Sequence, residues 1–224
     1  FYFIGNDDLL AILGSDDVQA ISKHFKKMFP GVSTIQFDKL SNSITGVLSE
    51  SGEQVKLVEP VMLEKYDRID EWISQLDYQI KVTIATLVSK CLAGFESHRL
   101  TYLFSLYPEQ VVLLSFQILW TKTTELSISQ KDDSSQINQL DSYLELLSSQ
   151  NHQNDKRFES LIIESYHQRE VLYILQTHKV TSIHDHHWYS QQKFYHSDKC
   201  SDILTSVQVR QLTMTLDYGF EYLG

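Results

Sequence analysis

The side chains best suited to chemistry form a histidine-rich cluster, with one cysteine, in the last quarter of the chain: His178, His184, His186, His187, His196 and Cys200. Zinc favours imidazole nitrogen and thiolate sulfur, supplied by short paired motifs. On a helical turn, His184 and His187 can face the same way, and His196 can pair with Cys200 likewise. This pattern supports a zinc-binding helical adaptor or enzyme built on the His184 cluster. The spacing matches no standard zinc motif, and histidines at a helix end beside the core residue Trp188 are the competing interpretation.

Two acidic pairs near the start of the chain, Asp7-Asp8 and Asp16-Asp17, offer oxygen ligands for calcium or magnesium. They lack the D-x-D-x-D-G ladder and the spaced bidentate Glu of a calcium loop. Both pairs directly precede apolar helical patterns, where aspartate is a preferred N-cap. Capping therefore explains these residues more simply than a metal site.

Motifs that define the common enzyme classes are missing from the sequence. No Gly is followed by Lys, so there is no P-loop, and G-x-S-x-G, H-E-x-x-H and C-x-x-C are also absent. Cys91 falls on an apolar helical stripe, which is typical of a core thiol. The residues thus predict a scaffold with no catalytic residue, no bound cofactor and no metal in this segment.

The composition bounds the class of protein. The 224 residues are 42% hydrophobic and 21% charged, as in an ordinary globular chain. The net charge of −10 lacks the basic excess that nucleic-acid binding needs. Two cysteines make no disulfide framework, and the longest nearly apolar run, Val111 to Trp120, is shorter than the roughly 20 residues that span a bilayer. We expect a soluble, acidic, intracellular protein that binds neither nucleic acid nor membrane.

The first part of the chain changes from a helical period to a strand period. Apolar residues recur at spacings of three and four up to Phe29, and Pro30-Gly31 ends the helix. Alternation then predicts an antiparallel meander of three strands, closed by Pro60, with strands at 33–38, 44–49 and 55–58. Such a meander is stable only when it packs on helices.

The remainder is predominantly helical in pattern. An unbroken apolar stripe predicts a long helix over 69–95, and Pro108 opens a second helix that runs to about Leu126. Ser127 to Gln136 reads as a polar connector, and β-like sequence begins at Val207. Two further helices are predicted at 137–147 and 157–179. The predicted fold class is mainly α, with packed long helices and a small antiparallel β-meander insert near residues 33–58.

Both ends of the chain suggest a piece of a longer protein. The last residues, Tyr218 to Gly224, alternate aromatic or apolar with polar residues and then stop, and an open apolar edge of this kind favours aggregation. Phe1 to Ile4 begins without Met and without the features of a signal peptide. We therefore expect the natural chain to continue at both ends.

Seven blocks of this sequence, in order, resemble dynein heavy chains. They cover the chain from end to end and are Phe1–Leu10 with Ile12 and Gly14, His24–Phe29 with Gly31 and Val32, Glu71-Trp72, Gln110–Trp120, His167–Val171, Trp188 with Phe194-Tyr195, and Tyr218–Gly224. Each block alone is weak, but their shared order makes the resemblance specific. Gly5, Gly14 and His167–Arg169 resemble the cytoplasmic branch of the family more than the axonemal branch.

The resemblance implies a mechanical role for this segment. Residues 1–206 resemble the C-terminal part of the dynein linker, the helical lever across the AAA+ ring. Residues 207–224 resemble the β-like entry into the first AAA+ module, whose P-loop follows this block in the family. The parent would then be a cytoplasmic motor of the microtubule cytoskeleton. It would use ATP and magnesium, contain a coiled coil, and bind microtubules and dynein light and intermediate chains. The segment itself would contact the AAA+ ring of its own heavy chain and hydrolyse nothing.

The lever interpretation also identifies positions where the chain can bend or transmit force to the next element. Hinge or junction candidates are Gly5, Gly14, Tyr218, Gly219, Phe220, Leu223 and Gly224. The segment from Tyr66 to Lys179 is expected to be a rigid base. The sequence departs from the family at Ser127–Asp155 and His184–Cys200, so contacts made there in other dyneins do not transfer. An unrelated helical interaction module remains an alternative, which the presence of a P-loop soon after Gly224 in the parent would exclude.

Overall fold

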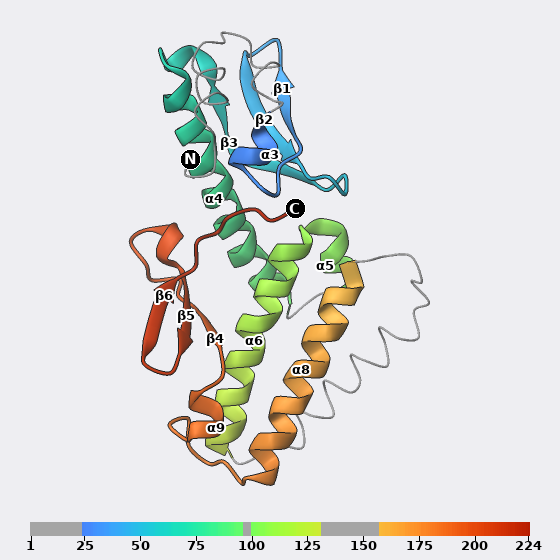
Figure 1. Ribbon diagram of the computed structural model, residues 1–224, viewed down its shortest axis with the longest axis vertical. Helices are drawn as coiled ribbons and strands as arrows, with labels where there is room; N and C mark the ends of the chain where they lie inside the picture. The colour runs from blue at the N-terminus through green and yellow to red at the C-terminus, as the bar shows by residue number, and fades with distance from the viewer. Residues whose placement is uncertain (1–23, 96–99, 131–156) are drawn as a thin grey trace. The chain divides into compact units, whose positions relative to one another are not determined.

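The computed structural model of the protein describes residues 24–95, 100–130 and 157–224 (Figure 1). Contacts between Cα atoms divide the chain into two compact units. Unit 1 comprises Phe1–Lys90, Leu106–Val111 and Gly219–Gly224, and unit 2 comprises Cys91–Ser105 and Val112–Tyr218. Within the described residues, unit 1 therefore joins residues 24–90 with a short piece from the middle of the chain and the last six residues. Among the described helices, none has an apolar stretch long enough to cross a bilayer.

Unit 1 contains the predicted meander. After the short helix α3 (Phe25–Met28), three antiparallel strands follow in the order β1-β2-β3, with β1 at Thr34–Asp38, β2 at Ser43–Leu48 and β3 at Gln54–Met62. The central strand β2 is the most buried, with Ile44 and Val47 wholly inaccessible to solvent. Apolar β-branched side chains at these positions suit a strand covered on its inner face.

The prediction that Pro60 closes the meander is wrong, because β3 continues through Pro60 to Met62. Between the pairs Ile44–Val61 and Gly46–Lys56 the register shifts, so that four residues of β3 face one residue of β2. Pro60 lies in this irregular stretch of an edge strand. A proline is tolerated there because no neighbouring strand needs its missing N–H group.

The meander packs on the first part of α4 (Ile69–Gly94), as its small size requires. Short helix η1 (Leu63–Lys65) connects β3 to this helix. Trp72, on the first turn of α4, is buried and meets the ring of Phe25 edge-on at a centroid distance of 6.3 Å. The N–H group of Val58, within the irregular part of β3, donates to Thr83 Oγ1 on α4 at 3.0 Å. A side chain of the helix thus satisfies a backbone donor that the shifted register leaves available.

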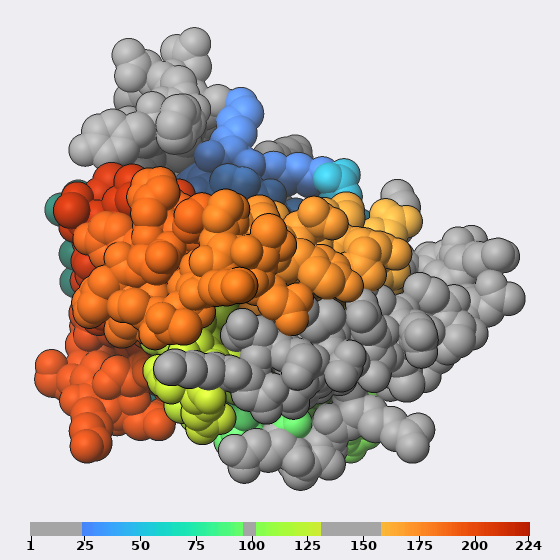
Figure 2. Space-filling model, turned by 90° about the horizontal axis from the view of Figure 1, so that it is seen from below, coloured from blue at the N-terminus to red at the C-terminus, as the bar shows by residue number. Residues whose placement is uncertain are grey.

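Unit 2 is built on most of α5 (Leu100–Leu106), α6 (Glu109–Gln130) from Val112 onward, and α8 (Arg157–Thr177), together with the last residues of α4. The helices α6 and α8 run side by side (Figure 1), and their atoms lie against each other when seen from below (Figure 2). The rings of Phe104 and Phe158 meet at a tilt of 54°, with their centroids 4.9 Å apart. Cys91 is fully buried, as predicted for a core thiol, and burial raises the pKa of its thiol to about 11.

Helix α6 is longer than predicted. The pattern places its end near Leu126 and a polar connector from Ser127, but the helix continues to Gln130. Ile128 is buried, and Ser129 Oγ donates to the carbonyl of Glu125 within the helix at 2.8 Å. Burial of one apolar side chain per turn outweighs the modest helix propensity of serine. The predicted helix at 137–147 and the rest of the connector lie outside the described residues.

Helix α8 ends without a glycine. Lys179 takes the left-handed backbone conformation, with φ of 50°, and Val180 N–H then donates to the Leu175 carbonyl at 3.0 Å. This is the 6→1 bond of a Schellman motif, in which glycine is the usual residue at the left-handed position. The chain continues to a one-turn helix, α9 (His186–Tyr189), and to a second antiparallel sheet.

The second sheet has the order β4-β5-β6, with β4 at Lys193–His196, β5 at Val207–Gln211 and β6 at Met214–Asp217. One-turn helix η2 (Ile203–Thr205) precedes β5. Strand β4 lies next to α6, and Phe194 N–H donates to Thr121 Oγ1 of that helix at 3.1 Å. The predicted β-like sequence from Val207 forms β5 and β6. The predicted fold class, mainly α with a small β-meander insert, is confirmed.

Replacing Lys179 by glycine should stabilise the protein. A side chain at φ of 50° costs roughly 1 kcal/mol relative to glycine, so the Lys179→Gly substitution should raise the free energy of unfolding by about 0.5–1 kcal/mol. Urea unfolding followed by circular dichroism measures this. Lys199→Gly, at an exposed residue without a positive φ, is the control and should be neutral or destabilising. Equal effects of the two substitutions would contradict the assignment of the helix end.

Candidate functional site

The last six residues, Gly219–Gly224, form a segment of unit 1 that we call the C-terminal strap. The side-chain amide of Gln110, in the first turn of α6, bonds twice to the backbone of the strap. Gln110 Nε2 donates to the carbonyl of Glu221 at 2.6 Å, and Leu223 N–H donates to Gln110 Oε1 at 3.0 Å. One glutamine thereby supplies a donor and an acceptor to the strap as a neighbouring strand would.

Glu53, in the turn between β2 and β3, connects the strap with the start of α6. Glu53 Oε2 accepts a hydrogen bond from Tyr222 Oη at 2.6 Å, and Oε1 accepts from the backbone N–H of Glu109 at 2.8 Å. The second bond satisfies one of the N–H groups that open the first turn of α6, where a negative charge is also favourable. A single carboxylate thus joins the meander, α6 and the strap.

The turn that carries Glu53 is itself well ordered by hydrogen bonds. Ser49 N–H donates to the Glu53 carbonyl at 2.9 Å, and Glu53 N–H donates to Ser49 Oγ at 3.1 Å. Gly52 has φ of 87°, which the turn requires and which a side chain would resist. The carboxylate is therefore presented from a turn with a fixed geometry.

Tyr222 is the apolar anchor of the strap. Its side chain is 4% exposed, and its ring lies in unit 1 with its hydroxyl on Glu53. Burial, followed by the hydrogen bond to the Glu53 carboxylate and its charge, raises the pKa of Tyr222 well above the usual value for a phenol. The neutral phenol is the form that donates, so the contact persists across the whole neutral range.

Gly31 allows the strap to approach the backbone directly. A Cβ atom at this position would lie 2.3 Å from the Tyr222 carbonyl oxygen and 2.6 Å from the Gly224 nitrogen. Real Cβ atoms do not come this close to backbone atoms, and a backbone cannot yield as a flexible side chain does. The glycine after Pro30 is therefore needed for packing and does more than end α3.

Of the junction residues named from the sequence, Tyr218 and Gly219 fall at the division between the units, and Phe220, Leu223 and Gly224 lie within the strap. Tyr218 belongs to unit 2, where its N–H donates to the Val207 carbonyl at 2.9 Å, and Gly219 begins the strap. Phe220 is buried although its φ is 50°, an unfavourable conformation for a bulky residue. Gly5 and Gly14 lie outside the described residues. Whether any of these positions acts as a hinge stays a prediction.

A small cleft of about 240 Å³ lies beside the strap in unit 1. Apolar side chains from α3, the following loop and α4 form most of its wall, with the ring of Tyr222 on the strap side. Its lining residues are Lys27, Met28, Phe29, Pro30, Val32, Asp77, Ile80, Lys81, Glu221 and Tyr222. Lys81 is paired with Asp77 at 2.7 Å, so its charge is compensated.

The histidine-rich cluster is arranged around α9. Asp185 caps this helix by accepting the His187 N–H at 2.9 Å, and the same oxygen lies 2.9 Å from His187 Nδ1. Two hydrogen bonds from His187 lower the pKa of Asp185. The ring of His187 stacks on that of His178 at 3.9 Å. His186 and His187 open the one-turn helix α9, and His178 directly follows the last residue of α8.

The other members of the cluster have separate partners. His196 Nδ1 lies 3.6 Å from the Asp198 carboxylate, and Cys200 Sγ contacts the Ser197 carbonyl at 3.3 Å. Within the part of the chain that the structure describes, no group of three or more His, Cys, Asp or Glu side chains is placed to hold a metal ion. The arrangement of these residues gives the zinc interpretation no support.

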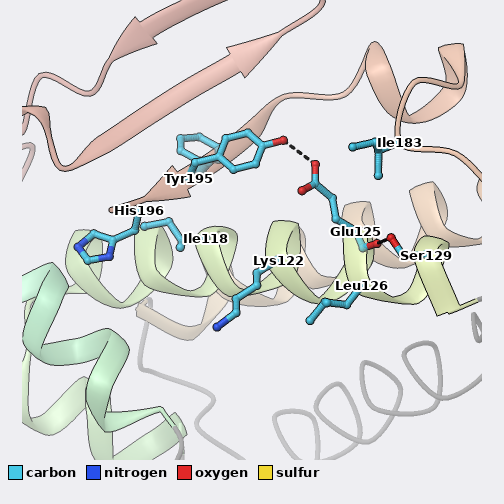
Figure 3. A pocket seen from close by; sticks show the side chains of 9 residues that line it. Ile118, Lys122, Glu125, Leu126, Ser129, Ile183, Tyr195 and His196 are labelled. Atoms are coloured by element: carbon cyan, nitrogen blue, oxygen red, sulfur yellow. Dashed lines mark hydrogen bonds between the residues drawn. The ribbon is translucent and has the colours of Figure 1, made fainter. Parts of the chain in front are cut away.

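Glu125, on α6, is the centre of a polar network, and Figure 3 shows its hydrogen bond to Tyr195. Glu125 Oε1 accepts from Tyr195 Oη at 2.6 Å and from Trp188 Nε1 at 3.2 Å. Lys193 is 5% exposed and donates to the carbonyls of Trp188 and Tyr189, at the end of α9. Burial lowers the pKa of Lys193 and raises that of Tyr195. An adjacent pocket of about 380 Å³ includes Glu125, Lys122 and Tyr195 in its lining.

Comparison with known proteins agrees with the resemblance seen in the sequence. Residues 1–91 match a family model described as "Dynein heavy chain, N-terminal region 2". Over the whole chain, the identity is 35% to the cytoplasmic dynein heavy chain of Eremothecium gossypii, 34% to that of Saccharomyces cerevisiae and 33% to that of Dictyostelium discoideum. The match covers 100% of this chain in each case, but only 6%, 6% and 5% of the relatives' lengths.

The chain therefore belongs to the dynein heavy chain family. It corresponds to a segment of a much longer protein in these relatives, and the family match at its start is to an N-terminal region of the heavy chain.

Not all of the residues that bind the strap can be predicted from the sequence. The Tyr218–Gly224 block was recognised, but Glu53 and Gln110 are 169 and 113 positions from their strap partners, and no local pattern connects them. From the sequence, Gly31 is predicted to end a helix and belongs to a block that resembles dynein heavy chains, but neither observation indicates a packing role. Its proximity to Pro30 hid a second role that depends on a distant segment.

Gly31→Ala should release the strap. The added methyl group collides with backbone atoms, so we expect a loss of about 1–3 kcal/mol in unfolding free energy and faster amide exchange at Leu223. Gly219→Ala is a matched control within the strap, because its Cβ would meet only Glu221 Cγ at 4.0 Å. Slow exchange at Leu223 in the Gly31→Ala variant would show that the strap is not held in this way.

Tyr222 should make stability depend on alkaline pH. Because the pKa of Tyr222 is higher in the folded than in the unfolded protein, its contribution is fully present below about pH 10 and declines as pH rises further. Tyr222→Phe should cost about 1–3 kcal/mol at pH 7, since Glu53 Oε2 loses its donor, and should flatten this alkaline decline. Urea titrations from pH 7 to 11 measure both effects. An unchanged alkaline slope would contradict the assignment.

Proposed function

We propose that this chain is a mechanical segment of a dynein heavy chain, which transmits conformational change between an AAA+ ring and the rest of the linker. Residues 1–206 would form the C-terminal part of the linker, and 207–224 would lead into the first AAA+ module. The observation that carries this proposal is the double anchoring of the C-terminal strap by Glu53 and Gln110. Because the strap is bonded to a turn and to the start of a helix, a force applied to the strap would be transmitted to both.

Long helices with buried faces support a role in transmitting force. α4 and α6 span 26 and 22 residues, and close-packed interiors resist deformation. The segment Tyr66 to Lys179 is proposed as the rigid base, with bending closer to the preceding part of the linker. The segment itself would need no catalytic residue, because ATP and magnesium would be bound by the AAA+ ring of the same heavy chain.

The relatives are cytoplasmic dynein heavy chains, and the proposal extends their context to this chain. The complete protein would be an ATP-driven motor on microtubules in the cytoplasm, assembled with dynein light and intermediate chains. The cytoplasmic names of these relatives support the cytoplasmic branch over the axonemal one.

The test is to weaken the strap anchors in the complete heavy chain. Glu53→Gln combined with Gln110→Ala should leave basal ATP hydrolysis within about twofold, because neither residue would touch nucleotide. Microtubule gliding velocity should fall several-fold, since ring movement would no longer be passed on. Both rates are measured on the same preparation.

Tyr173→Phe, on an exposed part of α8, together with Lys26→Ala, at an exposed ion pair, provides a double variant as control and should change neither rate. A strap variant that glides at the normal velocity per ATP hydrolysed would overturn the proposal. Equal loss of hydrolysis and gliding would also overturn it, because the segment would then act on the chemistry and not on its transmission.

A further inference from the structure

The second sheet ends in an edge strand, β6, which is the outer strand of the order β4-β5-β6 (Figure 1). All four residues of β6 are exposed. Natural edge strands are blunted by small length, by charged side chains (especially lysine), by proline or by a bulge. β6 is short and carries one charged residue, Asp217, but its sequence, Met-Thr-Leu-Asp, contains neither lysine nor proline, and its register with β5 is regular throughout.

The hydrogen-bond pattern of the hairpin shows which groups this edge presents. Tyr218 N–H donates to the Val207 carbonyl, which makes Val207–Tyr218 a hydrogen-bonded pair. Because such pairs alternate along an antiparallel ladder, Leu216 and Met214 also bond to β5. The N–H and C=O groups of Thr215 and Asp217 therefore point away from the sheet.

The same strand exposes apolar side chains on one face. Met214 and Leu216 are 61% and 59% exposed, and alternation places them on the same side of the strand. Leu216 continues a row through its partner Val209 to Phe194, which is next to α6. The row is covered at its β4 end and open at its β6 end.

The hairpin turn contains a leucine in the left-handed conformation. Leu212 has φ of 51° and is 48% exposed, where a glycine or asparagine would be the favourable residue. A left-handed leucine costs about 1 kcal/mol or more. The N–H group of Leu212 donates to the Tyr189 carbonyl at 3.2 Å, while its side chain stays half exposed and adds little buried apolar area.

We propose that β6 is a docking strand, and that its occupant is an extended segment of the heavy chain outside residues 1–224, added as a fourth strand. The inference rests on the proposed function. The relatives are long enough to supply such a segment, since this chain covers only 5–6% of their length. The added strand would bond to Thr215 and Asp217 and cover Met214 and Leu216 with alternate apolar residues.

The size of the edge favours this occupant over a second copy of the chain. Four residues provide little area, whereas a stable interface between separate proteins buries at least about 1,000 Å². A strand tethered in the same chain binds at high effective concentration, so a small contact is sufficient.

Hydrogen exchange at single-residue resolution in the intact, dilute heavy chain tests the proposal without ATP or microtubules. Thr215 and Asp217 amides should exchange as slowly as those of Met214 and Leu216. Leu216→Lys should accelerate exchange at Thr215 and Asp217 about tenfold or more, while the Tyr218 amide, bonded to Val207, stays protected. Ile163→Lys, at a 70% exposed site on α8, is the control and should change neither amide.

Fast exchange at Thr215 and Asp217 in the wild-type heavy chain would overturn the proposal. Protection that appears only as concentration rises would overturn it in favour of a second copy. If Leu216→Lys also exposes the Tyr218 amide, Met214→Lys replaces it as the variant that keeps the hairpin. None of these outcomes depends on motor coupling, so the docking strand and the lever proposal can fail independently.

Discussion

The organisation of unit 1 depends on the two hydrogen bonds that the Glu53 carboxylate accepts. Its two oxygens are used for different purposes, one for the Tyr222 hydroxyl and one for the N–H group at the start of α6. Both bonds are to a negative charge and are therefore stronger than neutral ones. Three parts of the chain that are far apart in sequence meet at this one side chain, which lies on a turn ordered by its own hydrogen bonds.

Unit 2 repeats this solution with different residues. Glu125 accepts from Tyr195 at 2.6 Å, the same distance as between Glu53 and Tyr222, and it also accepts from the indole of Trp188. In both units a carboxylate from an earlier part of the chain fixes an aromatic residue from a later segment. The aromatic ring supplies buried area and its polar tip supplies direction, so each late segment is held in one orientation.

The periodic parts of the fold could be predicted from the sequence, because their signal is local. The stripe through Trp72 and Leu76 gave α4 to within a residue at its C-terminal end, and strand alternation located the meander. Errors occurred where tertiary contacts override a local rule. Pro60 remains in a strand because it lies on an edge, and α6 passes the polar residues after Leu126 because Ile128 is buried.

The candidate site could be predicted only in part. The aromatic block around Tyr222 has a recognisable pattern, so it was found. The roles of Glu53 and of Gln110, which opens the block Gln110–Trp120, could not be predicted, since a polar side chain on a helix or in a turn is ordinarily solvated. Their roles arise only when the last residues of the chain fold back on them, and no spacing rule expresses a contact over more than a hundred positions.

The way Gln110 holds the strap has a consequence for how the sequence can vary. Its amide bonds to the backbone carbonyl of Glu221 and the backbone N–H of Leu223, and neither side chain is involved. Leu223 is 64% exposed. Substitution at these two positions therefore leaves the attachment intact, while Tyr222 between them is fixed. The exposed side chains of the strap can therefore change during evolution, and with them the surface that the strap offers to other parts of the protein. The hydrogen bonds between the strap backbone and Gln110 of α6 are kept.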